Sequence, residues 1–425
     1  MSELPAGWTE ASIFDVAELK DSIRVPLNGR QRSEMPGEYP YYGANGLVDH
    51  VGDYLFDGEH VLLAEDGGYF DDPRRGVAYK VGGRFWVNNH AHILEAIGGI
   101  PTEFLERWLN AVNWMPFVSG TTRLKLTQAG MRRVSLPLPP LTEQRRIVAK
   151  LDRLSARTRA VRAHLARVQS LSTRAKQATL AAAFDPAEHP AWRISTVEEV
   201  LAEGLIGLVR SKAQQSDLGT PYIRMNHYDL NGRWNDKDLT FVDVSANEFQ
   251  RFELRPQDLL FNTRNSAELV GKVALWPEGR PGHVFNNNLL RMRFRKEVDP
   301  TFAYFYMISP VFREFLESVK NATTSVAAIY QKSLMRGPFP VPETDEQTEI
   351  VRRIEAAFAR IDRMVEDATR ATHLLDRLDQ RLLARAFRGE LVPQDPSDEP
   401  AAKLLARIKA ARVAAPKKRG RRQRA

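Results

Sequence analysis

The chain has 425 residues, of which 43% are hydrophobic and 27% charged, and it contains no cysteine. This length suffices for two or three domains with ordinary hydrophobic cores. The absence of Cys excludes disulfides and thiolate metal sites. No apolar run approaches the roughly 18 residues of a membrane helix, and residues 1–5 do not resemble a secretory signal. We therefore expect a cytoplasmic protein without a membrane segment.

The net charge of +8 is unevenly distributed along the chain. Residues 141–184 carry +8 and residues 416–425 carry +6, whereas residues 1–140 carry −5 and residues 185–343 carry −1. The bulk charge is therefore weak support for nucleic-acid binding by the globular regions. The C-terminal tail has too little apolar content to fold alone. Phosphate binding and simple solubilisation are both open interpretations of it.

In chain order, the first region is predicted to be a mixed α/β domain. Short apolar runs bounded by Gly, Pro, Asn and Asp, such as Val61–Ala64 and Ala91–Ala96, indicate strands. The stretch Thr102–Trp114 has a more helical pattern. The order of the strands in a sheet cannot be predicted from these signals.

A long helix is predicted to follow from the signature at Leu136–Val148. Two prolines separated by one residue favour an extended approach, because proline fixes φ and disfavours helix in the residue before it. A Thr then opens the helix, with an acid in the first turn where the helix dipole favours it. From Ile147 to Ala182 a stripe of mostly apolar residues recurs at steps of four and three, which indicates coiled-coil packing.

The same order of elements returns in the second half of the chain. Gly271–Trp276 and Leu290–Phe294 are predicted strands, and Thr301–Val319 is the more helical stretch. The signature at Phe339–Val351 then precedes a second stripe that begins at Ile350.

The two halves are related by an internal duplication. The offset between matching residues is 184 at Trp8 and Trp192, and 203 at the two helix signatures. The growing offset indicates small insertions in loops. Each helix of about 40 residues would be roughly 60 Å long, and its narrow apolar stripe needs a partner helix. We expect the two helices to pair with each other, antiparallel, although a helix of another protein is an alternative partner.

We therefore predict an α/β protein with an internal two-fold duplication, in which two mixed α/β domains are joined by two long helices that form an antiparallel coiled coil. The predicted boundaries are 1–140 for the first domain, 141–184 for the first helix, 185–343 for the second domain, 344–388 for the second helix and 389–425 for a C-terminal extension with a basic tail.

No catalytic motif is recognisable. There is no phosphate-binding P-loop and no dinucleotide-binding glycine motif. His90 and His92 share one face of a predicted strand but lack a third ligand, and the acidic pairs Glu65-Asp66 and Asp71-Asp72 have the character of loop residues. We predict a binding protein, not an enzyme, with no metal or cofactor of its own.

Side chains suited to DNA contacts occur in corresponding places of both halves. Asn and Gln can pair with adenine, and Arg with guanine, in the major groove. The candidates in the first half are Asn45, Arg74, Arg75, Asn88, Asn89, Thr121, Thr122, Arg123 and Lys125. Those in the second half are Arg224, Asn226, Asn262, Arg264, Asn265, Ser266, Asn286, Asn287, Asn288, Thr323, Thr324, Gln331 and Lys332. A turn, a cap or a solvated position is the alternative for each.

Arg291, Arg293 and Arg295 alternate with apolar residues, as on a half-buried strand. Their side chains are expected either to face solvent or to form a row that contacts phosphates.

In these residues the chain resembles the specificity subunits of type I restriction–modification systems. Leu136–Val148 is similar to the central conserved region of that family, from which the second copy departs at Glu343-Thr344. The first half resembles one class of target recognition domain in the segments Tyr41–Gly46, Tyr54–Glu59 and Phe85–His92. The second half resembles another class in the segments Pro221–Arg224 and Asn262–Lys272. The resemblance covers nearly all of residues 1–390 and excludes the basic tail.

The resemblance implies a non-catalytic reader of double-stranded DNA. Each target recognition domain would bind one half of a split target, and the paired helices would fix the spacing between the halves. The target would be asymmetric because the two domains differ in sequence. In the family, the helices also dock methyltransferase subunits, expected here to be two, which carry the S-adenosylmethionine site and methylate adenine. Separate restriction subunits carry the ATP- and Mg²⁺-dependent translocase and nuclease.

Three alternatives remain open from the sequence. The chain could be an enzyme in its own right, which the lack of a cofactor or metal motif disfavours. It could be a general nucleic-acid scaffold that also binds RNA, for which stacking aromatic residues on a sheet are expected. It could be a solitary specificity subunit without a working nuclease partner. Because the globular regions are not basic, we expect the chain alone to bind DNA weakly.

Overall fold

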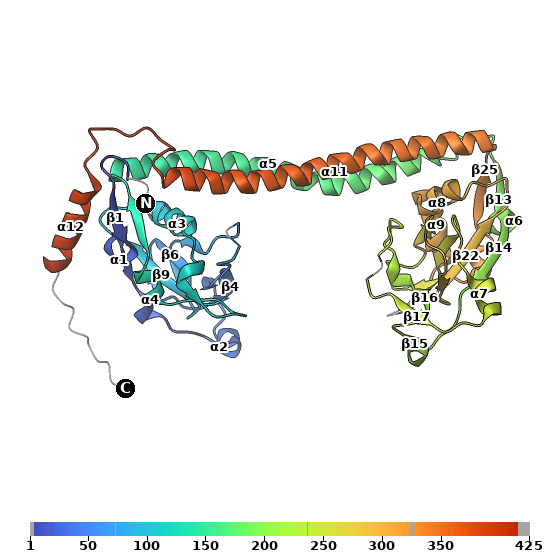
Figure 1. Ribbon diagram of the computed structural model, residues 1–425, viewed down its shortest axis with the longest axis horizontal. Helices are drawn as coiled ribbons and strands as arrows, with labels where there is room; N and C mark the ends of the chain where they lie inside the picture. The colour runs from blue at the N-terminus through green and yellow to red at the C-terminus, as the bar shows by residue number, and fades with distance from the viewer. Residues whose placement is uncertain (1–3, 73, 236, 324–325, 415–425) are drawn as a thin grey trace. The chain divides into compact units, whose positions relative to one another are not determined.

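The computed structural model describes residues 4–72, 74–235, 237–323 and 326–414 (Figure 1). The predicted basic tail from residue 416 lies outside the described residues. The chain divides into two compact units: unit 1 comprises residues 1–165 and 369–425, and unit 2 comprises residues 166–368. None of the described helices is long and apolar enough to cross a membrane.

Unit 1 contains two four-stranded sheets, with strand orders β2-β9-β6-β7 and β4-β3-β8-β5. All neighbours are antiparallel except the parallel pair β3 and β8. The elements are β1 (Thr9–Ser12), α1 (Ile13–Val16), β2 (Ala17–Leu19), α2 (Gly29–Glu34), β3 (Tyr39–Gly43), β4 (Gly46–Val51), β5 (Phe56–Asp57), β6 (His60–Ala64), β7 (Ala78–Val81), β8 (Arg84–Val87), β9 (Ala91–Ala96), α3 (Thr102–Ala111), β10 (Val118–Ser119), β11 (Lys125–Leu126), α4 (Gln128–Arg132), β12 (Ser135–Leu138) and α12 (Ala401–Ala414).

Unit 2 repeats this plan with the sheets β14-β22-β18-β20 and β15-β17-β16-β21, and its small sheet β19-β24-β23 corresponds to the pair β10-β11 and the Asp66–Lys125 bridge of unit 1. Here β16 and β21 form the parallel pair. The elements are β13 (Arg193–Thr196), α6 (Val197–Val200), β14 (Leu201–Ile206), β15 (Gln215–Ser216), β16 (Thr220–Ile223), β17 (Thr240–Val242), α7 (Ala246–Phe252), β18 (Leu259–Asn262), β19 (Arg264–Asn265), β20 (Val273–Leu275), β21 (Val284–Phe285), β22 (Leu289–Phe294), α8 (Pro300–Ile308), α9 (Pro310–Val319), β23 (Asn321–Ala322), β24 (Ala327–Ala328), α10 (Gln331–Leu334) and β25 (Pro338–Val341).

The duplication predicted from the sequence is confirmed in the register of the strands. Val61 lies opposite Leu94 in unit 1, and Leu259 lies opposite Met292 in unit 2, so both members of the pair keep the offset of 198 residues. The short first and last strands also correspond, because β1 pairs with β12 as β13 pairs with β25.

Both central strands are buried on both faces, which explains their continuous apolar runs. In β6, Val61 and Leu63 enter the core beneath α3, whereas Leu62 enters the core between the two sheets. In β18, Leu259 and Leu260 divide between two cores in the same way. Each first sheet is therefore the middle layer between a helical layer and a second sheet.

The predicted strands Val61–Ala64, Ala91–Ala96 and Leu290–Phe294 are confirmed, whereas the strand predicted at Gly271–Trp276 is limited to β20. The helical stretch Thr301–Val319 is two helices, α8 and α9. Its break has a local cause: Pro310 has no N–H to continue α8, and the Ser309 side chain instead caps α9 by accepting from the Phe312 N–H at 3.3 Å.

The long helices α5 (Leu141–Ala183) and α11 (Thr344–Ala386) have 43 residues each and pack antiparallel within each unit. In unit 1, Arg162 of α5 forms ion pairs with Asp376 at 2.6 Å and Asp379 at 3.0 Å of α11. In unit 2, Lys176 pairs with Asp362 at 2.6 Å. The expectation that the two helices pair with each other is therefore confirmed.

The apolar stripe is only partly buried by this pairing. Ile147 and Leu151 are buried at one end of α5, and Ile350 and Ile354 are buried at one end of α11. Several apolar side chains along the helices remain exposed, namely Val161 (45%), Leu171 (56%), Met364 (62%), Leu374 (55%) and Leu378 (43%).

The repeated helix signature forms the same polar contacts at the start of both helices. The indole N–H of Trp8 donates to Glu143 at 2.9 Å, and that of Trp192 donates to Glu346 at 2.8 Å. The adjacent glutamine, Gln144 in unit 1, donates to the carbonyl of Pro139 at 3.0 Å. These contacts join the residue before β1 or β13 to the start of the long helix of the same unit.

Gln347, the unit 2 equivalent of Gln144, is fully buried and makes three hydrogen bonds. Its amide nitrogen donates to the carbonyls of Pro342 and Glu297 at 2.8 Å each, and its oxygen accepts from the Asp299 N–H at 2.9 Å. Gln347 therefore joins α11 to the loop before α8 as well as to the proline-containing segment that leads into α11.

We predict that Gln347→Met costs more stability than Gln144→Met. Gln144→Met leaves one backbone carbonyl without this partner and Gln347→Met leaves three backbone groups, at about 1–3 kcal/mol for each group that is shielded from water. We therefore expect a loss of about 1–3 kcal/mol for Gln144→Met and a loss of about 3 kcal/mol or more for Gln347→Met, measured by calorimetric unfolding of the full chain. Arg352→Gln, on a side chain that is 67% exposed, is the control and should change stability little. Equal losses of stability for the two variants would contradict the conclusion that Gln347 joins more parts of its unit than Gln144 does.

Candidate nucleic-acid interface

The predicted residues of unit 1 gather on loops at the end of β6. The Asn45 amide donates to the carbonyl of Gly67 at 3.0 Å. Arg123 forms an ion pair with Asp66 at 2.7 Å, and Lys125 lies 3.5 Å from Glu65. The loops that carry residues 45, 65–67 and 121–125 therefore form one continuous polar surface.

Glu65 and Asp66, which sequence analysis assigned to ordinary loop positions, are the carboxylates of this surface. Asp66 accepts from Arg123 and also lies 3.4 Å from the His90 ring. A nucleic acid that approached Arg123 or Lys125 would compete with these carboxylates for the cations. The signal in the sequence was the acidic pair itself, directly after a buried strand.

The other candidates of unit 1 occupy the rim of this surface or turns within it. Arg75 stacks on the ring of Tyr69 at 3.5 Å, and Arg74 is paired with Asp72 at 2.8 Å. The Asn88 side chain accepts from the His90 N–H at 2.8 Å and so holds a turn. Asn89, Thr121 and Thr122 are exposed.

Asp21, Glu65 and His92 form a polar cluster beneath the surface. Their potential ligand atoms all lie within 4.8 Å of one another. The two carboxylates of the cluster already form ion pairs with a basic side chain, because Arg24 lies 2.7 Å from Glu65 and 3.2 Å from Asp21. It therefore has the character of an ion-pair network that supports the loops.

Burial alone would raise the pKa of Asp21, but the hydrogen bond from His92, at 2.6 Å, and the nearby positive charges outweigh it and hold the pKa below its usual value. The charged form of Asp21 is therefore the one that the folded protein stabilises. His92 is 1% exposed and also bonds the carbonyl of Leu126 at 3.0 Å, so the cluster ties β9 to β11.

In unit 2, four candidates line a single hollow of about 200 Å³. They are Arg264, Asn287, Asn288 and Gln331. The floor includes Ile206 and Ile329, and Tyr330 stands at the edge with 57% of its surface exposed. The sequence analysis missed Tyr330, although an aromatic side chain next to a candidate glutamine could have drawn attention to it.

Four other candidates of unit 2 are structural. Asn262 is fully buried, and its amide donates to the carbonyls of Arg264 and Asn288 at 3.1 Å each. Asn265 donates to Asn262 at 2.8 Å and accepts from the Ser266 N–H at 2.9 Å, and Asn286 is buried. The side chains of Asn262 and Asn265 hold the loops that present the hollow, and Ser266 contributes a backbone N–H.

The remaining candidates lie apart from the lining of the hollow. Arg224 is half-buried and donates to the carbonyl of Asp238 at 3.1 Å. Thr323 closes a turn by donating to the carbonyl of Val326 at 2.9 Å. Asn226 and Lys332 are exposed. Thr324 lies outside the described residues.

For Arg291 and Arg293, both interpretations from the sequence are wrong. Arg291 is 1% exposed and is bound to Glu203 at 2.7 Å, and burial lowers its pKa. Arg293 is bound to Asp258 at 2.6 Å and to Glu203 at 3.0 Å. Neither side chain forms a free phosphate-binding row, because carboxylates of neighbouring segments pair with both.

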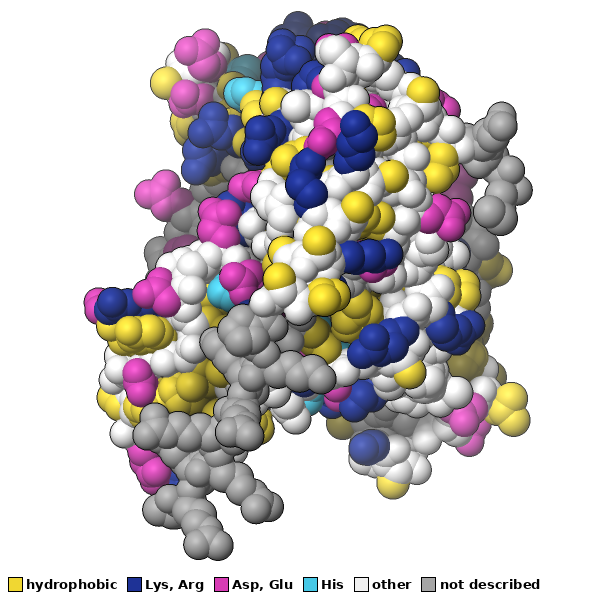
Figure 2. Space-filling model, turned by 90° about the vertical axis from the view of Figure 1, so that its left-hand side faces the viewer, with side chains coloured by type: hydrophobic (Ala, Val, Ile, Leu, Met, Phe, Trp, Pro, Cys, Tyr) yellow, Lys and Arg dark blue, Asp and Glu magenta, His cyan; other side chains and the backbone are white. Residues whose placement is uncertain are grey.

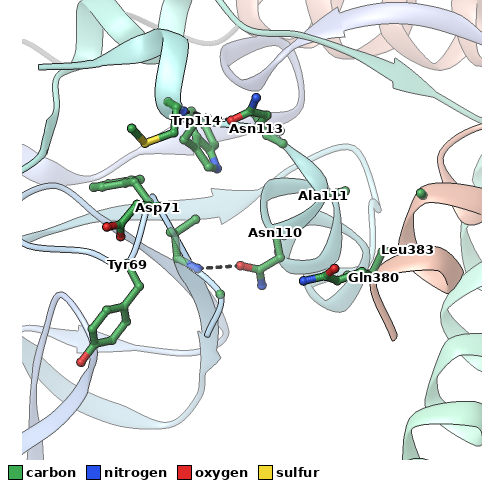
Figure 3. Close-up of a pocket in the computed structure, with 14 residues that line it drawn as sticks. Tyr69, Asp71, Asn110, Ala111, Asn113, Trp114, Gln380 and Leu383 are labelled. Atoms are coloured by element: carbon green, nitrogen blue, oxygen red, sulfur yellow. Dashed lines mark hydrogen bonds between the residues drawn. The ribbon is translucent and has the colours of Figure 1, made fainter. Parts of the chain in front are cut away.

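A separate cavity of about 430 Å³ lies in unit 1 between the end of α3 and the last turns of α11 (Figure 3). Asn110, on its wall, accepts from the Val77 and Ala78 N–H groups at 2.8 and 3.0 Å. Trp114 and Leu383 supply apolar walls. None of the predicted DNA-contacting residues that the structure describes lines this cavity.

Comparison with known proteins gives one consistent family. Residues 5–169 and 192–366 each match the family described as "Type I restriction modification DNA specificity domain". The chain is 30% identical over 317 residues to the EcoKI specificity subunit of Escherichia coli K12, covering 70% of this chain and 68% of that protein. It is 24% identical to the EcoDI specificity subunit of Escherichia coli, over 97% of both chains.

Two solved structures share the fold. A chain from a study of complex assembly and conformational transition of a type I restriction–modification system has a TM-score of 0.67 at 20% identity, over 92% of this chain and all of that chain. The HsdS subunit of Thermoanaerobacter tengcongensis has a TM-score of 0.54 at 20% identity, over 92% of this chain and 98% of that subunit.

We predict that Asp21→Asn destabilises the protein in a pH-dependent way. Because the pKa of Asp21 is lowered in the folded state, its contribution is fully present above about pH 4 and is lost as the pH falls below that value. The variant should be about 1–3 kcal/mol less stable at pH 7, and the difference should shrink toward pH 3, measured by urea unfolding. Asp57→Asn, on an exposed ion pair, is the control and should change stability little. A difference that does not vary with pH would contradict this role.

Proposed function

Because this chain belongs to the family of type I restriction–modification DNA specificity subunits, we propose that it reads a DNA target in two unlike parts, one through each α/β unit. In this proposal the target is bipartite and asymmetric. The polar loops of unit 1 contact one half-site, and the hollow of unit 2 contacts the other.

One observation carries the proposal: the two units present different chemistry at equivalent backbone positions. In unit 1, Asp66 lies opposite Lys125 in a bridge between the loops. In unit 2, the corresponding pair is Arg264 opposite Ala328. The backbone ladder is the same, but the acid is replaced by Arg and the Lys by Ala. Two surfaces with different charges favour different base edges.

The hollow of unit 2 offers the donors and acceptors that a major-groove reader uses. Arg264 is exposed beside it and can donate two hydrogen bonds to guanine, and the amides of Gln331 and Asn287 can pair with adenine. Arg123 and Lys125 of unit 1 would exchange their carboxylate partners for DNA.

The exposed apolar side chains of α5 and α11 support the docking of partner subunits. An apolar side chain that remains exposed along a paired helix offers the kind of contact that a subunit interface buries. We infer that methyltransferase subunits bind this surface, that the duplication favours two of them, and that the restriction subunits assemble on the same complex. The chain itself contributes no catalytic residue, and S-adenosylmethionine, ATP and Mg²⁺ bind to those partners.

The test is to co-express the chain with its methyltransferase subunit and to map methylated adenines across a genome. We expect a single split motif with two unlike halves and a constant gap. The double variant Arg264→Ala/Gln331→Ala should relax one half only, because each base contact contributes about 1–3 kcal/mol, a factor of roughly 5 to 150 in discrimination. Arg251→Gln on α7 is the control and should leave the motif unchanged. A symmetric motif in the wild type, or altered bases in both halves of the motif in the double variant, would contradict the proposal.

We also predict that the helices set the gap between the half-sites. Seven residues inserted in both helices, after Leu165 in α5 and after Ala368 in α11, keep the heptad register and add about 10.5 Å. At 3.4 Å per base pair this is about three base pairs. The same methylation map should show a longer gap, or no methylation, with both half-sites unchanged. Altered bases within a half-site would contradict this spacing role.

A further inference from the structure

We propose that Val48 and Asn88 of unit 1 together recognise a thymine, with the Asn88 amide donating to the thymine O4 atom and the Val48 side chain in contact with the C5-methyl group. The inference rests on the proposed function, because it requires that unit 1 reads the major groove of its half-site. It names the base that this pair of side chains selects, and it adds Val48 to the residues that read DNA.

The two side chains meet over Gly43, the last residue of β3. A Cβ at Gly43 would lie 3.0 Å from the Val48 Cγ2 atom and 3.0 Å from the Asn88 amide nitrogen, so these two atoms are at most twice that distance apart. A larger residue at this position would have to displace one of them. Gly43 therefore leaves room for an apolar group and a hydrogen-bond donor side by side.

A β-bulge determines where the Val48 side chain points. In the pairing of β3 with β4, Tyr42 lies opposite Leu47 and Tyr41 lies opposite Asp49, so Val48 is an extra residue in β4 (Figure 1). A bulge of this kind interrupts the alternation of the strand and redirects a side chain. The Val48 side chain is directed over Gly43 and is 55% exposed.

Exposure of an apolar side chain is not in itself the argument. On the side of the molecule that carries α12, apolar side chains stand in small groups among charged ones (Figure 2). Scattered exposure of this kind is ordinary for a protein surface. What distinguishes Val48 is the amide donor beside it and the bulge that brings the two together.

The orientation of the Asn88 amide is fixed by the protein. Its oxygen accepts from the His90 N–H at 2.8 Å, and its own backbone N–H donates to the carbonyl of Tyr42 at 3.0 Å. Because a backbone N–H can only donate, the amide oxygen must face it, which leaves the amide nitrogen on the other side. Among the residues that the structure describes, this nitrogen has no hydrogen-bond acceptor. Asn88 therefore offers a donor toward Val48.

The turn that holds Asn88 belongs to the polar surface of unit 1. The carbonyl of His90 accepts from the N–H of Glu65 at 2.8 Å and from that of Asp66 at 3.3 Å. Asp66 in turn forms the ion pair with Arg123 at 2.7 Å. The donor of Asn88 therefore lies on the surface that we assign to the half-site of this unit.

Thymine is the base that matches a donor next to an apolar group. In the major groove it presents the O4 acceptor beside the C5-methyl group. Cytosine presents a donor instead, guanine presents two acceptors without a methyl group, and adenine presents an acceptor and a donor. With its oxygen bonded within the turn, the Asn88 amide is better suited to donate to thymine than to pair through both of its atoms with adenine.

Unit 2 does not repeat this arrangement. Arg224 takes the position of Gly43, because each directly follows the parallel-paired residues of its strand. The Arg224 side chain donates to the carbonyl of Asp238 at 3.1 Å. Asn286, which takes the position of Asn88, is only 8% exposed, and the described pairing of β16 with β17 contains no bulge. The thymine contact is therefore a property of unit 1.

The test measures the affinity of the assembled methyltransferase complex for duplexes that contain its mapped target. In the half-site that Arg264→Ala/Gln331→Ala leaves unchanged, each thymine is replaced singly by deoxyuridine, which lacks only the C5-methyl group. We expect one thymine whose replacement weakens binding of the wild-type complex about threefold to fivefold, the effect of one buried methyl group. The complex with Val48→Ala should bind the thymine and deoxyuridine duplexes equally. Val413→Ala, on a valine that is 88% exposed, is the matched control and should keep the full deoxyuridine effect.

The amide is tested by Asn88→Asp, which keeps an acceptor for the His90 N–H and removes the donor. We expect the preference for A·T to fall by a factor of about 5 to 150 at the same base pair that responds to deoxyuridine. Asn89→Asp adds the same charge at the adjacent exposed residue. This control should weaken binding to all duplexes by a similar factor and leave the preference at that base pair unchanged.

Three results would overturn the thymine contact while a split target is still read. They are a unit 1 half-site without a thymine that responds to deoxyuridine, a response that persists in Val48→Ala, and an Asn88→Asp effect at a different base pair. A wild-type complex that does not discriminate its target from unrelated DNA would instead contradict the proposed function, and this inference with it.

Discussion

Each α/β unit depends on a polar connection at the start of its long helix, where a buried glutamine, Gln144 or Gln347, holds the approach and a tryptophan side chain bonds the preceding glutamate. The Trp8 indole reaches Glu143, and the Trp192 indole reaches Glu346, while the neighbouring glutamines hold the proline-rich approaches. A buried amide or indole without a partner is costly, so these bonds allow one direction for the helix against the sheet. The sheets, and the loops at the ends of their strands, take their position from this connection.

The duplicated scaffold separates stability from recognition. The strand pairings of the central sheets agree between the units, and the core on both sides of β6 and β18 is apolar. The loops that follow these strands are free to differ, because they add little to the core. The exchange of an acid and a Lys in unit 1 for an Arg and an Ala in unit 2 is such a difference, and it lies on a ladder that both units share.

Polar residues near these loops fall into two groups: those whose side chains reach the open surface and those whose side chains are bonded inside the protein and support that surface. Asn262 and Arg291 carry side chains suited to DNA, yet both are buried and bonded within the protein. Arg264 and Gln331 have similar chemistry but border an open hollow. The residue type is the same in both groups, and only the direction of the side chain relative to the strand and its neighbours separates them.

The sequence by itself determined the duplication, the mixed α/β class and the need of each long helix for a partner, because these follow from repeated spacing and hydrophobic period. The contacts of Arg162 and Lys176 with α11 decided that the two helices are each other's partner. The sequence also placed Arg264, Asn287, Asn288 and Gln331 among the candidates that one hollow brings together. Only the tertiary structure decided that Arg291 forms an ion pair with Glu203 and Arg293 with Asp258. It also decided that Arg123 forms an ion pair with Asp66 and that α12 packs on unit 1. These contacts join residues far apart in the chain, and local pattern holds no information about which distant carboxylate or apolar face will meet a given side chain.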